Sequence, residues 1–241
     1  MDNEKKEEIL FKAGIWFKEE IVKRHYASIE RMSNLKKVNI NPFTISYLSQ
    51  LLKGRIDTDG IARAIAYPSA LGARISTIFG NQIQSFVSTV LDCAGSGIDG
   101  IDIEFDDCID RIHKYCQMKA GPTTINKDDV KTISDHFTGV KRRFKTNNET
   151  ISNKQLVVGV VYGDRKSLAQ HYKNIETKYC YDVFVGRDFW TRLTGEKNFY
   201  FELIKSVNEV SKTIAANNKL EDAVQKIAKS SNLIDELKHL S

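Results

Sequence analysis

The sequence has few prolines and no stretch that looks like an interdomain linker. Only three of the 241 residues are proline, and no segment is rich in Gly and Ser or in Pro, the compositions typical of linkers. No internal repeat is found. Hydrophobic residues make up 41% of the sequence, which excludes a disordered chain, so the length fits one domain with a sizeable core.

Cysteine patterns that bind metals are also missing. The sequence contains four cysteines: Cys93, Cys108, Cys116 and Cys180. None belongs to a C-x-x-C pair, and no histidine lies at zinc-ligand spacing from one of them. The sequence therefore predicts reduced thiols and no zinc site.

Long apolar runs are absent as well. No run approaches the roughly 20 residues that are needed to span a bilayer. The first segment, MDNEKKEEIL, is too charged for a secretory signal peptide. We therefore expect a cytoplasmic protein with no membrane partner.

Charge of neither sign dominates the sequence. There are 36 Lys and Arg against 31 Asp and Glu, a net charge of +5, which indicates a nucleic-acid partner only weakly. The densest basic cluster surrounds Phe144 and consists of Lys141, Arg142, Arg143 and Lys145. This cluster is either the solvated end of a helix or a surface that meets phosphates.

Apolar residues at helical spacing predict helices in the N-terminal part of the chain. We expect one helix over residues 4–31, a second over 43–52 that ends at Gly54, and a third over 59–66. Pro68 is expected to restart the chain, because proline lacks the N–H that continues a helix.

The clearest helix is expected over residues 75–90. Apolar residues recur there at three- and four-residue steps: Ile75, Ile78, Phe79, Ile83, Phe86, Val87 and Val90. Gln82 falls inside this apolar stripe, so its amide must be satisfied or used. It is either a hydrogen-bonded core residue or part of a site.

The period changes from 3.6 to 2 after a glycine-marked loop over residues 94–97. Ile101, Ile103 and Phe105 alternate there with Asp102, Glu104 and Asp106. A turn leads to a second run over residues 115–120, and the two runs predict an antiparallel hairpin.

The rest of the chain predicts two more strands and several helices. A helix is expected over residues 127–146 with Asn126 as its N-cap. The apolar run over 155–162 is typical of a strand buried on both faces, and 181–185 predicts another strand. Further helices are expected over residues 188–193 and, as a pair, over 198–240. This order predicts a mixed sheet with helices on both sides.

Four polar residues of the hairpin share one face. Residues two apart lie on the same side of a strand, so Asp102 shares a side with Glu104, and Gln117 with Lys119. If the apolar sides lie together, two carboxylates, an amide oxygen and an ammonium meet on one surface. Phosphodiester hydrolysis needs such groups, because Mg2+ prefers oxygen ligands and a lysine can orient the attacking water or offset developing charge. An ordinary solvated hairpin is the alternative.

Longer blocks around the hairpin carry a family resemblance. They are Gly100–Phe105 (GIDIEF), Tyr115–Pro122 (YCQMKAGP), Thr124–Val130 (TINKDDV) and, further along, Gly186–Trp190 and Leu193–Gly195. Together they resemble type II restriction endonucleases of the PD-(D/E)xK superfamily, with a likeness that extends from about Pro42 to Phe201.

The resemblance implies an α/β fold with a PD-(D/E)xK nuclease core, which is a mixed sheet flanked by helices. N- and C-terminal helical additions complete it. We expect a single domain over residues 1–241, divided into N-terminal helices (1–68), a catalytic core (69–195) and C-terminal helices (196–241).

The resemblance also implies a role for each residue of the hairpin. Asp102 stands where the family has its first metal-binding aspartate, and Lys119 is the motif lysine. Gln117 takes the place usually held by Asp or Glu, which leaves one negative charge fewer near the metal. Glu104 is therefore expected to supply a second carboxylate.

Two further residues are alternatives for the metal site. Asp99 is a rival for Asp102, although Asp102 begins the alternating strand and Asp99 lies in the glycine-flanked loop. Gln82 stands on the helix where related enzymes often carry a glutamate.

DNA contacts are expected at the start of one helix and in the basic cluster. Asn126 and Lys127 offer a helix N-terminus and a positive charge to a phosphate, although a simple N-cap accounts equally well for Asn126. The other expected DNA contacts are Lys141, Arg142 and Arg143. Arg187 and Arg192 are alternatives, and Trp190 is expected in the core.

The resemblance implies a type II restriction endonuclease that hydrolyses double-stranded DNA at one sequence with Mg2+ and leaves 5′-phosphates. A homodimer is expected on a palindromic site, and a cognate DNA methyltransferase is the expected genetic partner in a restriction–modification system. A repair or recombination nuclease of the same fold, or a non-catalytic DNA-binding module, is the alternative. Cleavage at one fixed sequence would distinguish a restriction enzyme from a repair or recombination nuclease. The presence of Asp102 and Lys119 argues against a non-catalytic module.

Overall fold

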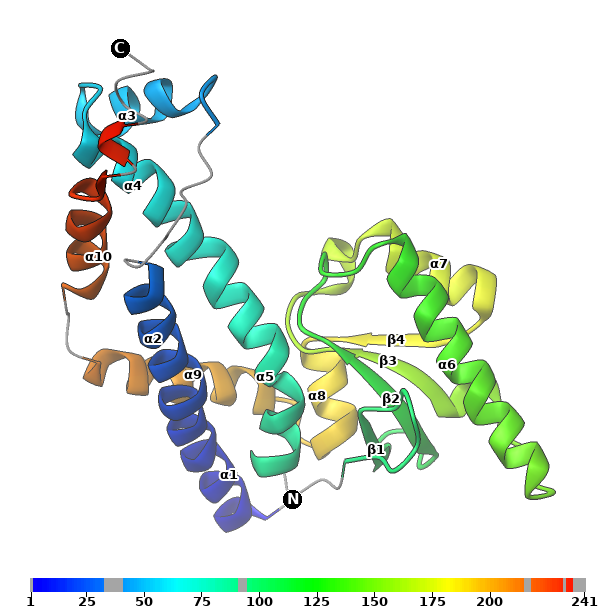
Figure 1. Cartoon of the computed structure of the whole chain (residues 1–241). Coiled ribbons are helices and arrows are strands. Elements are labelled where there is room, and N and C mark those ends of the chain that lie inside the picture. The colour runs from blue at the N-terminus through cyan, green and yellow to red at the C-terminus, as the bar shows by residue number, and fades with distance from the viewer. Residues whose placement is uncertain (1, 33–40, 91–94, 215–217, 232, 236–241) are drawn as a thin grey trace. The chain divides into compact units, whose positions relative to one another are not determined.

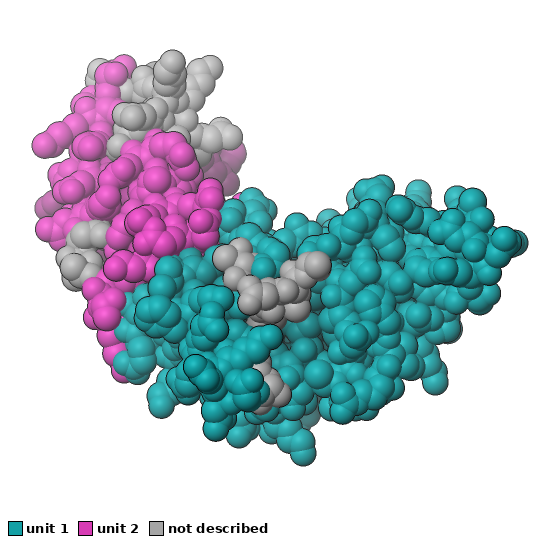
Figure 2. Space-filling view, turned by 90° about the horizontal axis from the view of Figure 1, so that it is seen from below, with its two compact units in different colours: residues 1–16, 80–211 teal, residues 17–79, 212–241 magenta. Residues whose placement is uncertain are grey.

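Two compact units make up the chain in a computed structural model, which describes residues 2–32, 41–90, 95–214, 218–231 and 233–235 (Figure 1). Unit 1 consists of Met1–Trp16 and Gly80–Ser211, and unit 2 of Phe17–Phe79 and Lys212–Ser241 (Figure 2). Each unit therefore combines segments that are distant in the sequence. The expectation that they fold as one domain stays a prediction.

Unit 1 contains a mixed sheet with the strand order β1-β2-β3-β4. Its strands are β1 (Ile103–Asp106), β2 (His113–Lys119), β3 (Leu156–Val160) and β4 (Asp182–Val185). β1 is antiparallel to β2, while β3 is parallel to both of its neighbours, β2 and β4. The predicted hairpin and the predicted mixed sheet are both confirmed.

The helices that belong wholly or mainly to unit 1 are α1 (Asn3–Trp16), α5 (Ile75–Val90), α6 (Lys127–Thr146), α7 (Gln170–Tyr179), α8 (Arg187–Thr194) and α9 (Phe199–Thr213). Two short 3-10 turns are η3 (Asn153–Gln155) and η4 (Arg165–Ser167). The sequence did not predict α7, because only Tyr172 and Ile175 of this largely polar helix are buried.

Helices cover both faces of the sheet, as predicted (Figure 1). On one face, apolar residues of α6 and α7 pack with β3 in a single core that includes Ile133, Phe137, Val140, Tyr172, Ile175, Leu156, Val158 and Val160. On the other face, the ring of Phe189 in α8 lies so close to Gly159 of β3 that a side chain at this glycine would collide with it. The strand β3 is buried along its whole length.

Aromatic rings continue the packing on the α8 side of the sheet within unit 1. Trp190 is fully buried and donates from Nε1 to the carbonyl of Val161 at 2.8 Å. Its ring centroid lies 5.8 Å from that of Phe86, which in turn lies 4.7 Å from that of Trp16. The expectation that Trp190 belongs to the core is confirmed.

Unit 2 is helical among its described residues. Its elements are η1 (Phe17–Val22), α2 (Lys23–Met32), α3 (Ile45–Lys53), α4 (Thr58–Pro68), η2 (Ser69–Arg74) and α10 (Lys219–Ala228). Gly54 ends α3 in the left-handed conformation, with φ 68°, as predicted.

The predicted break at Pro68 is wrong. Pro68 is the last residue of α4 and has helical dihedrals, φ −60° and ψ −37°. The wider π-helical turns of η2 follow it and lead directly into α5. Such turns absorb the lost backbone hydrogen bond of a proline, so the helix continues where the sequence suggested an end.

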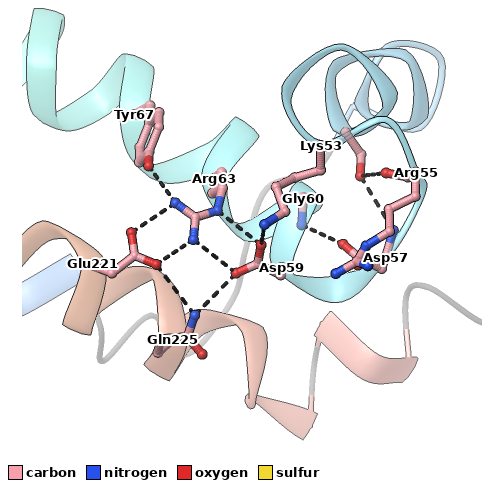
Figure 3. A network of polar contacts seen from close by, with 10 residues as sticks. Lys53, Arg55, Asp57, Asp59, Gly60, Arg63, Tyr67, Glu221 and Gln225 are labelled. Carbon is pink, nitrogen blue, oxygen red and sulfur yellow. Dashed lines mark hydrogen bonds and ion pairs between the residues drawn. The ribbon is translucent and has the colours of Figure 1, made fainter.

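An ion-pair network fastens α10 to α4 within unit 2 (Figure 3). The Arg63 guanidinium donates to Asp59 at 3.0 Å through Nε and to Glu221 at 2.8 Å through Nη1, and Gln225 donates to Asp59 at 3.2 Å. The hydrogen bond from Arg63 is the main reason why the pKa of Asp59 falls to about 2.

No helix in the described part of the chain combines the length and the apolar character that crossing a bilayer requires.

Candidate active site

Two hydrogen bonds hold Asp102 against β2. Its backbone N–H donates to the carbonyl of Cys116 at 3.0 Å, and its carboxylate Oδ2 accepts from the backbone N–H of Met118 at 2.6 Å. Met118 lies between Gln117 and Lys119 in the sequence. These bonds therefore place the Asp102 carboxylate beside the strand that carries the other two residues of the predicted centre.

The other carboxylate oxygen of Asp102 contacts α5. Oδ1 accepts a hydrogen bond from Nε2 of Gln84. The side chain of Gln82, which the sequence indicated, makes no hydrogen bond with any residue that the structure describes. The sequence pattern did not indicate Gln84, because this residue lies on the exposed face of its helix, outside the apolar stripe that contains Gln82.

Burial dominates the electrostatics of Asp102. It raises the pKa of this carboxyl above its ordinary value, and the hydrogen bonds from Met118 and Gln84 and the positive charge of Lys119 offset only part of the effect. The Nζ atom of Lys119 also lies 3.5 Å from Oδ1 of Asp129 on α6. A poorly hydrated carboxylate gains stabilisation from any cation bound beside it.

Gln117 is buried, with 5% of its surface exposed, so the alternative of an ordinary solvated hairpin is excluded at this position. Its Nε2 donates to the carbonyl of Gly100 and to Nδ1 of His136 on α6, the latter at 2.6 Å. Its Oε1 accepts no hydrogen bond from the described residues. The amide oxygen is thus free to bind a ligand.

Gly100 and His136 lie in close contact next to this amide. Gly100 has φ +76°, and a side chain at this position would collide with the His136 ring. Only glycine therefore fits here. The sequence did not indicate His136, since one polar residue on a helix with a strong apolar face carries no distinguishing pattern.

Glu104 shares a sheet face with Gln117 and Lys119, since the register pairs it with Tyr115. Its carboxylate accepts from Ser96 Oγ and lies 3.3 Å from Nε2 of His113. The role of Glu104 as second carboxylate stays a prediction.

Asp99 is exposed, and no hydrogen bond links its side chain to the described parts of the chain. The Asp102 carboxylate, in contrast, accepts two hydrogen bonds. The geometry favours Asp102 as the organised carboxylate.

Asn126 caps α6, as predicted. Its Oδ1 accepts from the backbone N–H groups of Asp128 and Asp129 at 2.8 and 3.0 Å, and Asp129 accepts from the N–H of Asn126 at 2.9 Å. These first N–H groups are therefore already paired. Lys127 beside them is exposed, and its side chain has no hydrogen-bonding partner among the residues described.

The basic cluster lies at the opposite end of α6. Seventeen residues of helix from Lys127 to Arg143 span roughly 24 Å at the usual rise per residue. Lys141 bonds to Asn153 Oδ1 at 2.5 Å and lies 4.9 Å from the centre of the Tyr181 ring, whereas the side chains of Arg142 and Arg143 are exposed. The structure does not bring this cluster to Asp102.

The two arginines near the last strand also differ. Arg192 lies 2.7 Å from the carboxylate of Asp107 and 4.1 Å from the centre of the Phe184 ring, so internal contacts account for it. Arg187 is exposed, with its Nε bonded to the carbonyl of Lys197.

The donor set of this site fits a hard cation that keeps most of its water. In the described residues, no three His, Cys, Asp or Glu side chains gather closely enough to enclose a metal. One carboxylate oxygen from Asp102 and the amide oxygen of Gln117 are, however, the kind of ligands that Mg2+ takes alongside waters and phosphate oxygens. A lysine beside them adds the positive charge that a phosphate requires.

The comparison with protein families agrees with this geometry. The model of the type II restriction endonuclease EcoO109I family matches residues 14–215, which include all four strands and every residue of the site. No curated protein matches the chain.

Proposed function

Since the chain belongs to the family of the type II restriction endonuclease EcoO109I, we propose that it hydrolyses both strands of double-stranded DNA at one sequence with Mg2+. The family makes the chain a DNA-binding hydrolase, a site-specific deoxyribonuclease. Our proposal concerns the residues, the metal ion and the products. It rests above all on the hydrogen bond between Asp102 and the N–H of Met118, which aligns the carboxylate with Gln117 and Lys119.

Asp102 and Gln117 would hold the ion through oxygen atoms, with Glu104 as the proposed second carboxylate. The bound Mg2+ would stabilise negative charge on the scissile phosphate and make water more acidic. The free Oε1 of Gln117 and the paired Nε2 support this assignment, because only the oxygen can face a cation.

Lys119 would act on the attacking water. Its ammonium can orient that water or take its proton, and it offsets the negative charge that develops on the phosphate. Asp129, 3.5 Å away, restrains the direction of this long side chain. DNA phosphates away from the reacting bond would be contacted by Lys127, Arg142 and Arg143. Lys141 would join them if it leaves Asn153 and Tyr181.

The remaining features follow from the family and from symmetry. We propose that the products carry 5′-phosphates, that a homodimer reads a palindromic sequence, and that a cognate methyltransferase protects the host DNA in a restriction–modification system.

Incubation of purified protein with plasmid DNA and Mg2+ tests the function. Discrete fragments with 5′-phosphate ends are expected, and their loss is expected when a chelator removes the metal. A smear would instead indicate a nonspecific nuclease, and binding without cutting would indicate a DNA-binding module.

Single substitutions test the assignment of the site. Asp102→Asn and Lys119→Ala should each lower the cleavage rate by about 10²-fold or more while leaving the circular dichroism spectrum unchanged. Asp135→Asn and Lys131→Ala are matched controls, because these exposed side chains of α6 have no bonding partner among the described residues. Wild-type cleavage by either site variant would refute the assignment.

A further inference from the structure

An amide in place of a carboxylate creates a problem of orientation at the centre of the site. The two ends of a glutamine amide have similar shape, but only the oxygen can bind a cation, and a half-turn of the amide replaces it with nitrogen. A glutamate has two oxygens and does not face this choice. A protein with Gln117 therefore needs something that fixes the amide.

The structure contains two acceptors that do so. The carbonyl of Gly100 and Nδ1 of His136 both receive hydrogen bonds from Nε2 of Gln117. A half-turn of the amide would place Oε1 against both acceptors and leave a buried group unpaired, which costs about 1–3 kcal/mol for each lost bond. Only one orientation is compatible with this pair.

His136 provides one acceptor and packs against the residue that provides the other. Its Nδ1 is the first acceptor, and its ring lies so close to Gly100 that a side chain at this glycine would collide with it. In this contact Nδ1 is the acceptor, because the amide nitrogen of Gln117 can only donate. The ring is half-buried, as a fixed orienting group should be.

We propose that His136 is a positioning residue that holds the amide of Gln117 with its oxygen toward the metal ion. The inference rests on the proposed function, in which Gln117 is a ligand. It adds a requirement that a glutamate-containing site would not have: the contribution of His136 to metal binding exists only as long as residue 117 is an amide.

The first test uses the metal-free protein. Gln117→Glu identifies the side-chain amide signals of Gln117 in a 15N-correlated NMR spectrum, since they disappear in that variant. In wild type these hydrogens should exchange slowly with solvent. His136→Leu, which retains bulk without an acceptor, should speed this exchange at least about tenfold, as expected for loss of one hydrogen bond. His136→Asn, which places an acceptor near the position of Nδ1, should restore slow exchange.

The second test measures Mg2+ affinity by titration calorimetry. His136→Leu should weaken binding by about 10- to 100-fold, the usual cost of removing a group that orients a ligand. His136→Asn should recover most of the affinity. His171→Leu is the matched control, because this half-buried histidine of α7 forms no hydrogen bond in the described parts of the chain.

A double substitution separates positioning from general damage. In the Gln117→Glu background, His136→Leu should change Mg2+ affinity by less than about threefold, because a carboxylate has no wrong orientation. An equal loss in both backgrounds would overturn the proposal, and so would an Asn variant as weak as the Leu variant. If His136→Leu does not fold, His136→Phe serves with the same expectations.

The failure of this inference differs from failure of the proposed function. If Gln117→Leu binds Mg2+ as wild type does, Gln117 is not a ligand and the proposed metal site is wrong. If Gln117→Leu loses Mg2+ while His136→Leu retains it, the metal site stands and only the positioning role is wrong.

Discussion

Gln117 and Glu104 occupy the same face of the hairpin but have different neighbours. Gln117 contacts Gly100 and His136, while Glu104 contacts Ser96 and His113. A neutral amide gives the metal ion an oxygen but no charge, so the site depends on carboxylates elsewhere. The contribution of Glu104 is therefore the most informative quantity at the scale of single residues.

Glu104→Gln should lower the single-turnover cleavage rate by about 10²-fold, because it removes a charge that stabilises the metal ion. Gln117→Glu should keep part of the cleavage rate with an altered metal preference, because its second oxygen loses the hydrogen bonds that Nε2 makes to Gly100 and His136. The two changes together should partly restore activity if both residues share one ion. Asp106→Asn is the control, since Asp106 also contacts His113, at 2.8 Å, but is exposed. If the Glu104→Gln variant cuts at the wild-type rate, Glu104 does not contribute to the metal site and serves only as a partner of His113.

Sequence patterns identified the strand residues of the site better than its helix residues. Alternation over residues 101–106 and along β2 predicted that Asp102, Gln117 and Lys119 share one face, because a strand has a simple two-residue period. Gln84 and His136 come from two different helices. Their approach to the hairpin depends on packing between elements that are distant in the sequence, which no local pattern encodes.

At the scale of secondary structure, the link between α4 and α10 is expected to depend on pH. The pKa of Asp59 is lowered to about 2, first by its hydrogen bond from Arg63. Because the folded-state pKa lies below the unfolded value of about 3.9, this stabilisation is complete above about pH 4 and is lost as the pH falls through 2.

Asp59→Asn should therefore destabilise the protein by about 1–2 kcal/mol at neutral pH, after allowance for partial exposure of the pair. The difference between wild type and variant should shrink between about pH 4 and 2. Urea titrations followed by circular dichroism can measure it, with Asp222→Asn as control, because Asp222 is an exposed acid in the first turn of α10. A difference that is independent of pH would contradict the expectation.

Most elements followed from periodicity, and the exceptions have physical causes. The bounds of α6 and the burial of β3 were predicted because each pattern is long or wholly apolar. The break predicted at Pro68 is wrong because π-helical turns can accommodate a proline. The sequence does not predict α7 because only two residues of this helix are buried.

At the scale of the whole molecule, DNA binding should weaken as the salt concentration rises, because Lys and Arg side chains displace counterions from the DNA phosphates. Binding can be measured in Ca2+, which tolerates looser geometry than Mg2+ and should support binding better than cleavage. Lys127→Ala and Arg142→Ala should each reduce the log–log slope by about 1. Lys141→Ala should change it less, because Lys141 already bonds to Asn153. Equal slopes for wild type and all variants would mean that these residues do not contact DNA phosphates.

Because the backbone N–H of Met118 donates to the Asp102 carboxylate, hydrogen exchange at this amide reports on the position of that carboxylate. Most backbone N–H groups in a sheet donate to a neighbouring strand, but this one donates to the carboxylate itself. Slow deuterium uptake at Met118 therefore indicates that the hydrogen bond to the carboxylate is formed. In Asp102→Ala the amide of Met118 should exchange faster, while the amides of β3 keep their protection. This pattern would distinguish a folded but inactive variant from an unfolded one.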